Sequence, residues 1–150
     1  MQIKVKYHAD IDHLQKIAVG DWIDLRCAED VFIPVGGSKM ISLGISMELP
    51  EGYEAHILPR SSTFMRYGIL LTSGMGIIDN GYNGDGDIWH FCAWCISGKD
   101  FQNGERGTII QKNARICQFR IMPKQDSEIE FVAVESLGNE DRGGLGSTGV

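Results

Sequence analysis

Pro59-Arg60-Ser61-Ser62 combines a guanidinium with two hydroxyl groups directly before a short predicted helix, Thr63 to Tyr67. Unpaired N–H groups and a partial positive charge make a helix N-terminus a ready site for phosphate. Arginine and hydroxyl side chains there would add charge-assisted hydrogen bonds. The structural alternative is that Ser61 or Ser62 only caps the helix, which would end at Gly68.

Asp79 is the candidate catalytic group. It follows the aliphatic pair Ile77-Ile78 at a strand-to-turn transition, and Tyr82 comes three residues later. A carboxylate on such a rim can position and deprotonate a water molecule. The structural alternative is an Asx-turn at this aspartate. A calcium loop is excluded because its third and twelfth positions would be Gly81 and His90, and the twelfth should be Glu.

Two predicted strands carry polar side chains of less obvious purpose. Arg115-Ile116-Cys117-Gln118 lies in one, and strand alternation predicts that Arg115 and Cys117 share a face while Gln118 occupies the other. Asp24 is a lone acid near the start of an earlier strand. Each is ordinary by itself, so a functional interpretation needs support from elsewhere in the chain.

The last nine residues, Arg142 to Val150, contain four glycines, one guanidinium and two hydroxyls. Such a segment cannot build a core, but its backbone N–H groups and its arginine can wrap a polyphosphate. A frayed terminus is the structural alternative. Two tempting motifs are set aside: Cys92-Ala93-Trp94-Cys95 lacks a second pair for zinc, and the tail lacks the lysine of a P-loop.

The elements that must position these residues are predicted to be strands. Apolar and polar residues alternate from Ile41 to Leu49, as in a half-buried strand, and the pattern continues over Tyr53, Ala55 and Ile57. No long segment has the 3.6-residue period of a helix. We therefore expect an all-β sandwich or barrel with one short helix. Further strands are predicted over Ile88 to Ile96, Arg115 to Met122 and Ile129 to Val134.

Length and composition limit the class of function. A chain of 150 residues is long enough for one domain with a sizeable core. Its net charge of −6, with scattered basic residues, argues against a nucleic-acid polymer as partner. The chain shows no signal-peptide core and no membrane-length apolar run, so we expect a cytoplasmic protein with no membrane association. Its four cysteines are then expected to be free thiols.

Taken together and in this order, the segments resemble the five motifs of the homotrimeric dUTPase family. The resemblance covers nearly the whole chain, and five motifs in order at compatible spacing are specific. It is nearest to the dUTPases of Gram-positive bacteria and their phages, given Gly20 to Arg26 and Leu49 to His56. The motifs are Asp24-Leu25-Arg26, Pro59-Arg60-Ser61-Ser62, Gly76-Ile77-Ile78-Asp79 with Tyr82, Arg115-Ile116-Cys117-Gln118, and Arg142-Gly143 through Gly146-Ser147-Thr148-Gly149.

The resemblance implies a jelly-roll-like β subunit in a homotrimer, with active sites at the subunit interfaces. The implied reaction converts dUTP and water to dUMP and pyrophosphate, with Mg2+ bound to the triphosphate. Residues 1–141 would form the β-sandwich nucleotide-hydrolase domain, and residues 142–150 would form a flexible C-terminal lid.

The resemblance also implies residue roles. Asp79 would hold the attacking water, and Asp24 and Gln118 would orient waters around Mg2+. Arg142 would neutralise the γ-phosphate, and Tyr82 would pack on the deoxyribose and exclude a 2′-hydroxyl. The other implied substrate-binding residues are Arg60, Ser61 and Ser62 for the bridging phosphates, Asp87 and Ile88 for the uracil edge, and Ser73, Gly76, Ile77, Ile78, His90, Gln118, Gly146, Ser147 and Thr148.

Two departures from the family pattern concern the base. Ser73 stands where the family often has Asn. Leu145 replaces the tail phenylalanine that stacks on the base, and the spacing between the tail arginine and glycine is two residues shorter. The stacking side chain is then expected among Trp89, His90 and Phe91, with His90 as the first candidate.

Three other functions fit parts of the pattern. A dCTP deaminase shares the fold but needs a glutamate on the strand after the motif-three aspartate, where Ile88 to Cys92 has no acid. A phage dUTPase can be a regulator that binds a phage or host protein, and no inserted surface segment is evident to favour this. A β-sandwich binding module with a disordered tail leaves the ordered motifs unexplained.

Overall fold

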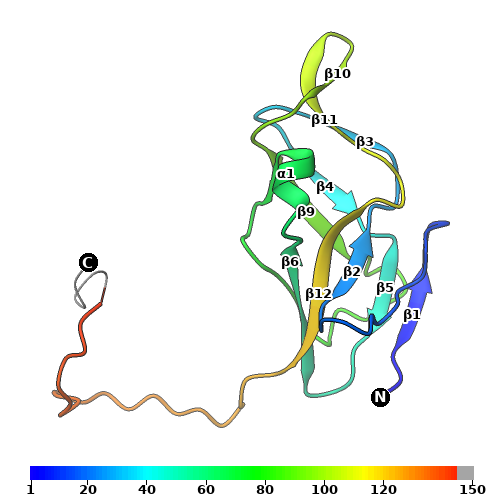
Figure 1. The fold of residues 1–150 in the computed structure, drawn as a ribbon. Helices are drawn as coiled ribbons and strands as arrows, with labels where there is room; N and C mark the ends of the chain where they lie inside the picture. The colour runs from blue at the N-terminus through cyan, green and yellow to red at the C-terminus, as the bar shows by residue number, and fades with distance from the viewer. Residues whose placement is uncertain (145–150) are drawn as a thin grey trace.

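The computed structural model describes residues 1–144. Over these residues it contains twelve strands and one short helix (Figure 1), which confirms the predicted all-β class. The elements are β1 (Lys4–Tyr7), β2 (Ile23–Arg26), β3 (Val31–Pro34), β4 (Ser38–Ser42), β5 (Ile45–Glu48), β6 (Tyr53–Pro59), α1 (Thr63–Tyr67), β7 (Ile69–Leu71), β8 (Gly76–Ile78), β9 (His90–Cys95), β10 (Asp100–Gln102), β11 (Glu105–Ile110) and β12 (Arg115–Pro123).

The strands pair antiparallel in four small sheets, with orders β1-β5, β10-β11-β3, β2-β12-β6-β8 and β4-β9-β7. The four-stranded sheet positions most of the candidate site. Its central ladder runs from Cys117 opposite Pro59 to Pro123 opposite Tyr53. The candidate residues on β2, β8 and β12 are therefore placed by their register on this sheet.

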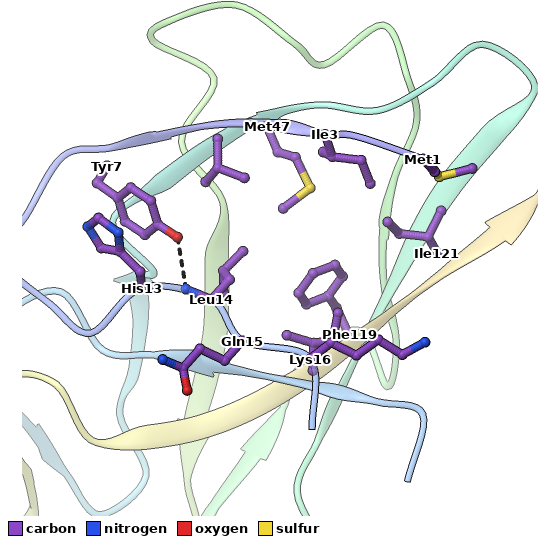
Figure 2. Close-up of a pocket in the computed structure, with 12 residues that line it drawn as sticks. Met1, Ile3, Tyr7, His13, Leu14, Gln15, Lys16, Met47, Phe119 and Ile121 are labelled. Carbon is purple, nitrogen blue, oxygen red and sulfur yellow. Dashed lines mark hydrogen bonds between the residues drawn. The ribbon is translucent and has the colours of Figure 1, made fainter. Parts of the chain in front are cut away.

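A groove of about 560 Å³ lies beside β1 and the coil that follows it (Figure 2). Its lining is mainly apolar. Tyr7 closes one end, where its ring stacks on His13 at 3.9 Å and its hydroxyl accepts a hydrogen bond from the Leu14 N–H at 2.8 Å. The apolar lining residues include Ile3, Val5, Leu14, Met47, Phe119 and Ile121.

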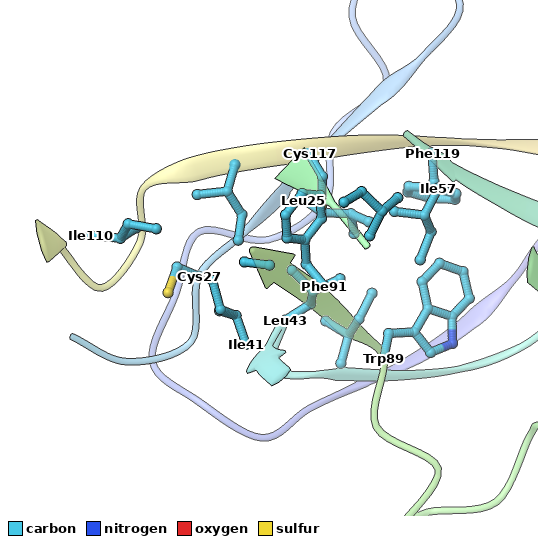
Figure 3. Packing of buried hydrophobic residues seen from close by; sticks show 14 of the residues in the cluster. Leu25, Cys27, Ile41, Leu43, Ile57, Trp89, Phe91, Ile110, Cys117 and Phe119 are labelled. Carbon is cyan, nitrogen blue, oxygen red and sulfur yellow. The ribbon is translucent and has the colours of Figure 1, made fainter. Parts of the chain in front are cut away.

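The core collects the inward-facing side chains of the sheets (Figure 3). Trp89, Phe91 and Phe119 are its largest members, and each is buried. The rings of Trp89 and Phe119 meet edge to face, with centroids 5.3 Å apart, a favourable geometry for aromatic pairs. This packing joins the residue directly before β9 to β12, and both strands carry candidate site residues.

The prediction of one strand from Ile41 to Leu49 is wrong. The segment forms β4 and β5, and the chain changes direction at Gly44, whose φ is 67°. A side chain there would also come within 3.0 Å of the Ala28 methyl group. The apolar residues of the pattern are all buried, but Gly44 and Ser46 between them are buried too, because β4 joins β9 and β5 joins β1.

The strand predicted at Ile129 to Val134 is also wrong for this chain. Residues 124–144 lead away from the sheets (Figure 1), and no strand is assigned there. Phe131 is 90% exposed and Val132 is 71% exposed. A strand needs a neighbour for its backbone hydrogen bonds, and the rest of the described chain offers none at this place. We call residues 124–144 the arm.

Helix α1 has the predicted boundaries. Ser62 is its N-cap residue, and Gly68 ends it in the left-handed conformation with φ of 64°. The four cysteines are free thiols, as expected. Within residues 1–144, no helix has the length and the apolar composition needed to span a membrane.

Candidate active site

The segment after β8 forms a pocket of about 280 Å³, here called the loop pocket. Strand β8 pairs with β6, and its end delivers Asp79 to the rim of the sheet. The structure brings six of the predicted residues together here, and it adds Met40 from β4. The lining residues are Met40, Ile77, Ile78, Asp79, Tyr82, Ile88 and His90.

Asp79 forms the Asx-turn that the sequence left open as an alternative. One of its carboxylate oxygens, Oδ1, accepts a hydrogen bond from the Gly81 N–H at 2.8 Å. Its carbonyl accepts another from the Tyr82 N–H at 3.2 Å. These bonds fix the orientation of the carboxylate, and the second carboxylate oxygen lies outside them. The turn is therefore compatible with a role for Asp79 toward a water molecule.

The loop over residues 79–88 is held by its own hydrogen bonds. The Tyr82 hydroxyl donates to the Ile88 carbonyl at 3.1 Å, which sets the tyrosine ring across the loop. The Asp87 side chain accepts from the Gly84 N–H at 2.7 Å. The N–H groups of Asp87 and Ile88 donate to carbonyls of Gly84 and Gly86. A base edge would therefore meet carbonyl acceptors here and not these two N–H groups.

Only one of the three stacking candidates at the start of β9 can reach a base. Trp89 and Phe91 have no exposed surface because both face the core. His90 lies between them on the opposite face and lines the loop pocket. Ser73 lies in the exposed turn before β8, where its hydroxyl donates to the Met75 carbonyl at 3.1 Å. Ser73 is not among the residues that line the loop pocket.

A second group of candidate residues, here called the charged cluster, gathers where β6 ends. The Asp24 carboxylate lies 2.8 Å from Arg60 Nε and 3.2 Å from Arg115 Nη1. Gln118 is the register partner of Asp24 on β12, and its amide donates to the Pro59 carbonyl at 3.2 Å. The structure thus joins three motifs that are far apart in the sequence.

The prediction that Arg115 and Cys117 share a face is wrong. A β-bulge lies between them, since Arg115 pairs with Arg26 and Cys117 pairs with the next residue, Leu25. The extra residue lets Arg115 reach solvent while Cys117 stays buried. A bulge re-aims a side chain in this way at many strand ends.

Thr63 is a residue of the charged cluster that sequence reasoning missed. Its buried hydroxyl accepts from the Arg60 N–H at 2.9 Å and donates to the Ile116 carbonyl at 2.8 Å. These bonds tie the turn before α1 to the bulge in β12. The Ser62 side chain makes no capping bond, so Thr63 supplies the local anchoring that the sequence assigned to a serine. The sequence signal that could have identified Thr63 is a hydroxyl side chain three residues after Arg60, where the turn begins.

Cys117 lies beneath this cluster and does not act as a thiolate. Burial raises the pKa of the Cys117 thiol well above its ordinary value, and the negative charge of Asp24 raises it further. Burial also raises the pKa of Cys27 and of Cys95. A thiol is a nucleophile only in its ionised form, so none of these three is suited to nucleophilic catalysis.

The tail residues are only partly described. Arg142 is exposed at the end of the arm. The predicted roles of Leu145, Gly146, Ser147 and Thr148 fall outside the described residues. Within residues 1–144, no group of three or more His, Cys, Asp or Glu side chains is arranged to hold a metal ion.

The charged cluster and the loop pocket lie at opposite ends of β6. Asp79 follows Ile78, which pairs with Ala55, whereas Arg60 directly follows Pro59 at the other end. Five residues of strand separate these points, or roughly 16 Å at ~3.3 Å per residue.

Comparison with known proteins gives the same family throughout. The dUTPase family model matches residues 22–149. The SPbeta prophage-derived deoxyuridine 5'-triphosphate nucleotidohydrolase YosS of Bacillus subtilis (strain 168) is 50% identical over 150 residues, and the match covers 99% of each chain.

The fold is similar to solved phage structures. A mutant dUTPase of Staphylococcus bacteriophage 80alpha with dUpNHpp has a TM-score of 0.77 at 21% identity, and the match covers 99% of each chain. A mutant dUTPase from phage phi11 of S. aureus, solved with a structural Mg(II) ion, has a TM-score of 0.73 at 18% identity over 91% of this chain and 99% of that chain. These likenesses confirm the jelly-roll-like fold. With a family match over residues 22–149 and a relative 50% identical along the whole chain, this protein belongs to the dUTPase family.

Proposed function

We propose that this chain hydrolyses dUTP to dUMP and pyrophosphate, in the cytoplasm and with Mg2+. The observation that carries the proposal is the loop pocket, which places a carboxylate, a tyrosine and a histidine around one cavity in a chain of the dUTPase family. The carboxylate supplies a general base, which accepts a proton. The two rings supply surfaces for the sugar and for the nucleobase.

Asp79 is the general base of the proposed reaction. Its Oδ1 is held by the Gly81 N–H, and the other oxygen is assigned to the attacking water. The water oxygen forms a bond to the α-phosphorus while its proton passes to Asp79. The bond between the α-phosphorus and the bridging oxygen breaks, and pyrophosphate leaves with that oxygen. A positioned base of this kind contributes about 10²–10⁴-fold to a rate.

Tyr82, Ile88 and His90 are assigned to the nucleoside. The Tyr82 ring is fixed by its bond to the Ile88 carbonyl, so it forms a rigid wall against the deoxyribose and excludes a 2′-hydroxyl. The Asp87 and Ile88 carbonyls are the acceptors assigned to the uracil N–H. His90 is assigned to stack on the base in place of the tail phenylalanine. Gly76, Ile77 and Ile78 set the strand beneath them, and Ser73 is assigned to the turn beside the base.

The charged cluster and the tail are assigned to the phosphates. Arg60, Ser61 and Ser62 lie at the entry to α1, where Thr63 holds the backbone. Arg142 is assigned to the γ-phosphate, because a guanidinium there lowers the charge that repels a nucleophile. Gly146, Ser147 and Thr148 are assigned to close over the triphosphate as a lid made of residues 142–150.

Asp24 and Gln118 fit a hydrated Mg2+ that arrives on the triphosphate. Asp24 is already paired with two arginines, and the described residues contain no metal cluster. Mg2+ commonly keeps several waters and is bound through few carboxylates plus substrate phosphates. The ion would neutralise negative charge on the phosphate oxygens. Asp24 and Gln118 are assigned to hold its waters.

The separation of the two clusters supports a site built from more than one copy. The β- and α-phosphates of one nucleotide are only a few ångströms apart, whereas Arg60 and Asp79 of one chain are separated by about five residues of strand. A loop pocket from one copy and a charged cluster from another would meet at an interface. This separation supports interfacial sites, and membership of the dUTPase family is the basis for assigning a homotrimer.

The arm and the groove beside β1 also support assembly. The arm exposes Ile129, Phe131 and Val134. The groove has a volume of about 560 Å³ and a mainly apolar lining (Figure 2). Strand β1 pairs with β5 along one edge in the two-stranded sheet. An arm from a neighbouring copy would gain a strand partner and cover these side chains, and this would account for a strand pattern at residues 129–134 that has no partner within residues 1–144.

A regulatory role remains the second candidate, and one observation favours it. The β10–β11 hairpin projects from the sheets (Figure 1), and Phe101 on it is 65% exposed. A projecting aromatic side chain is a suitable anchor for a phage or host protein. Shortening the hairpin between Lys99 and Arg106 is expected to leave dUTP turnover intact, and a partner captured by the full chain but not by the shortened one would support the role.

Pyrophosphate release from dUTP, dTTP, dCTP and UTP, with and without Mg2+, tests the proposed function. We expect turnover of dUTP alone, and near-complete loss in Asp79→Asn with an unchanged melting temperature. Equal rates on dUTP and dTTP would contradict the assigned pocket, and wild-type turnover by the variant would contradict the assigned base.

A further inference from the structure

One face of the β1–β5 ladder contacts the loop over residues 79–88 at Asp85. Lys6 on β1 lies directly opposite Ser46 on β5. His8 comes two residues after Lys6, so it continues the same face. Ile45 and Met47 turn the other face of β5 to the core. Ser46 is nevertheless only 4% exposed, because Asp85 of the loop covers it.

A chain of two hydrogen bonds links His8 to the loop. The Ser46 hydroxyl donates to the Asp85 carbonyl at 3.1 Å, and His8 Nε2 lies 2.9 Å from the same hydroxyl oxygen. A serine hydroxyl has one hydrogen, and the carbonyl can only accept. His8 Nε2 must therefore carry a hydrogen and donate it to Ser46. His8 therefore donates to the Ser46 hydroxyl, and the Ser46 hydroxyl donates to the Asp85 carbonyl.

The neighbouring ion pair contributes less than this chain of bonds. Lys6 Nζ lies 3.2 Å from the Asp85 carboxylate, but the two side chains are 51% and 88% exposed. Exposed ion pairs are weak and screened by salt, whereas an unmade hydrogen bond to a buried hydroxyl leaves polar groups unsatisfied. Asp85 is thus held mainly through its backbone carbonyl.

The two ends of the loop are held by different contacts. The Asp79 end continues from β8 and has its own turn, and Lys124 Nζ contacts Asn80 Oδ1 at 2.6 Å. The Asp85 side is held by Ser46 and His8, and beyond it the Trp89 N–H donates to the Ile45 carbonyl at 2.9 Å. Gly86 alone separates Asp85 from Asp87 and Ile88, which are assigned to the base. A loosened Asp85 would therefore displace the base-binding side of the loop before it displaced the catalytic side.

We propose that His8 and Ser46 are positioning residues that set the base-binding side of the nucleotide pocket through the Asp85 carbonyl. The proposal rests on the proposed function for its kinetic consequence and on the structure alone for the anchoring. Neither residue touches the loop pocket or the charged cluster. Their effect is on KM and on the choice of base, with kcat little changed.

The test compares His8→Leu, His8→Gln and Ser46→Ala with a matched control, Lys4→Met. Lys4 forms an ion pair with Glu48 at 2.9 Å on the same ladder, and its side chain is 85% exposed. Glutamine restores an N–H donor near the position of Nε2, and leucine does not. Steady-state kinetics on dUTP and dTTP are measured together with amide hydrogen exchange of residues 79–88.

His8→Leu and Ser46→Ala are expected to raise KM for dUTP about three- to tenfold, as the loss of one hydrogen bond implies. In both variants, the rate of amide hydrogen exchange should rise above the wild-type rate more at residues 85–88 than at residues 79–81. The preference for dUTP over dTTP should fall. His8→Gln and Lys4→Met should match the wild type. Wild-type KM and exchange in His8→Leu, or a His8→Gln variant as impaired as His8→Leu, would overturn the proposal.

The exchange measurement separates this proposal from the proposed function. If the wild type failed to hydrolyse dUTP, the proposed function would fail, and exchange at residues 85–88 would still report whether His8 and Ser46 hold the loop. If the wild type hydrolysed dUTP and exchange were unchanged in His8→Leu, only the positioning role would fail.

Discussion

The two ends of β6 hold two different kinds of site. At one end, strands β2, β6 and β12 bring Asp24, Arg60 and Arg115 into ion pairs within the chain. At the other, a loop fixed by turn hydrogen bonds surrounds an open pocket with Asp79 at its rim. Strand register places the charged residues, and a loop places the residues proposed to select the nucleoside.

This difference has a consequence for assembly. Strand register cannot be adjusted by a residue without turning side chains to the other face, so the charged cluster is a fixed surface. The loop is held by its own turn hydrogen bonds and by contacts of its two sides with the sheets. The proposed phosphate surface and the proposed nucleoside pocket can therefore be combined across an interface between copies.

Removal of residues 142–150 tests whether the two clusters suffice without the tail. The deletion removes Arg142 and the tail hydroxyls but touches neither cluster. We expect kcat/KM for dUTP to fall roughly 10³-fold, since each lost group that stabilises developing charge lowers a rate by about 10²-fold or more. The melting temperature should stay within about two degrees, because the described part of this segment, residues 142–144, is exposed and exposed groups contribute little to stability. A misfolded deletion variant would refute the assignment of a lid.

Substitution of Arg60 tests the charged end. Arg60→Ala removes a phosphate-binding guanidinium and leaves Asp24 paired with Arg115 alone. Loss of a charge-assisted hydrogen bond predicts a fall in kcat/KM of about a hundredfold. Arg60→Lys keeps the charge without the planar fork, so it should recover part of the rate. Equal rates for the alanine and lysine variants would show that charge at this position is not used.

Substitution of His90 sharpens the assignment of the loop end. His90→Ala should raise KM for dUTP about tenfold, the size expected for lost base stacking. Cys92→Ala is the matched control, because Cys92 lies on the same face of β9 but does not line the loop pocket. If both variants behave alike, His90 contributes to the strand and not to the base.

The loop end could be predicted from the sequence more fully than the charged end. Ile77 to Tyr82 is a contiguous segment, so its local turn chemistry already places Asp79 and the tyrosine on one rim. The cluster at Asp24 depends on which strands pair and in what register. The bulge between Arg115 and Cys117 cannot be read from alternation, because it lies at Ile116, whose carbonyl bonds to Thr63, a residue far away in the sequence.

Other differences have the same physical origin. The period-2 pattern from Ile41 to Leu49 predicted the buried apolar side chains but not the burial of Ser46, and the turn at Gly44 involves close contact with Ala28. The pattern at residues 129–134 predicted a strand, and no strand of residues 1–144 pairs with this segment. Sequence patterns report the environment that a residue requires, and tertiary contacts decide where that environment is found.

Subunit mixing tests most directly the claim that Asp79 of one copy works with Arg60 of another. Asp79→Asn and Arg60→Ala chains, each nearly inactive, are unfolded, mixed in equal amounts and refolded together. With random assembly at interfacial sites, about a quarter of the sites receive both wild-type residues. We predict recovery of about a quarter of the wild-type dUTP turnover. Turnover no higher than that of the separate variants, in a mixture shown to contain both chains in one oligomer, would contradict the claim.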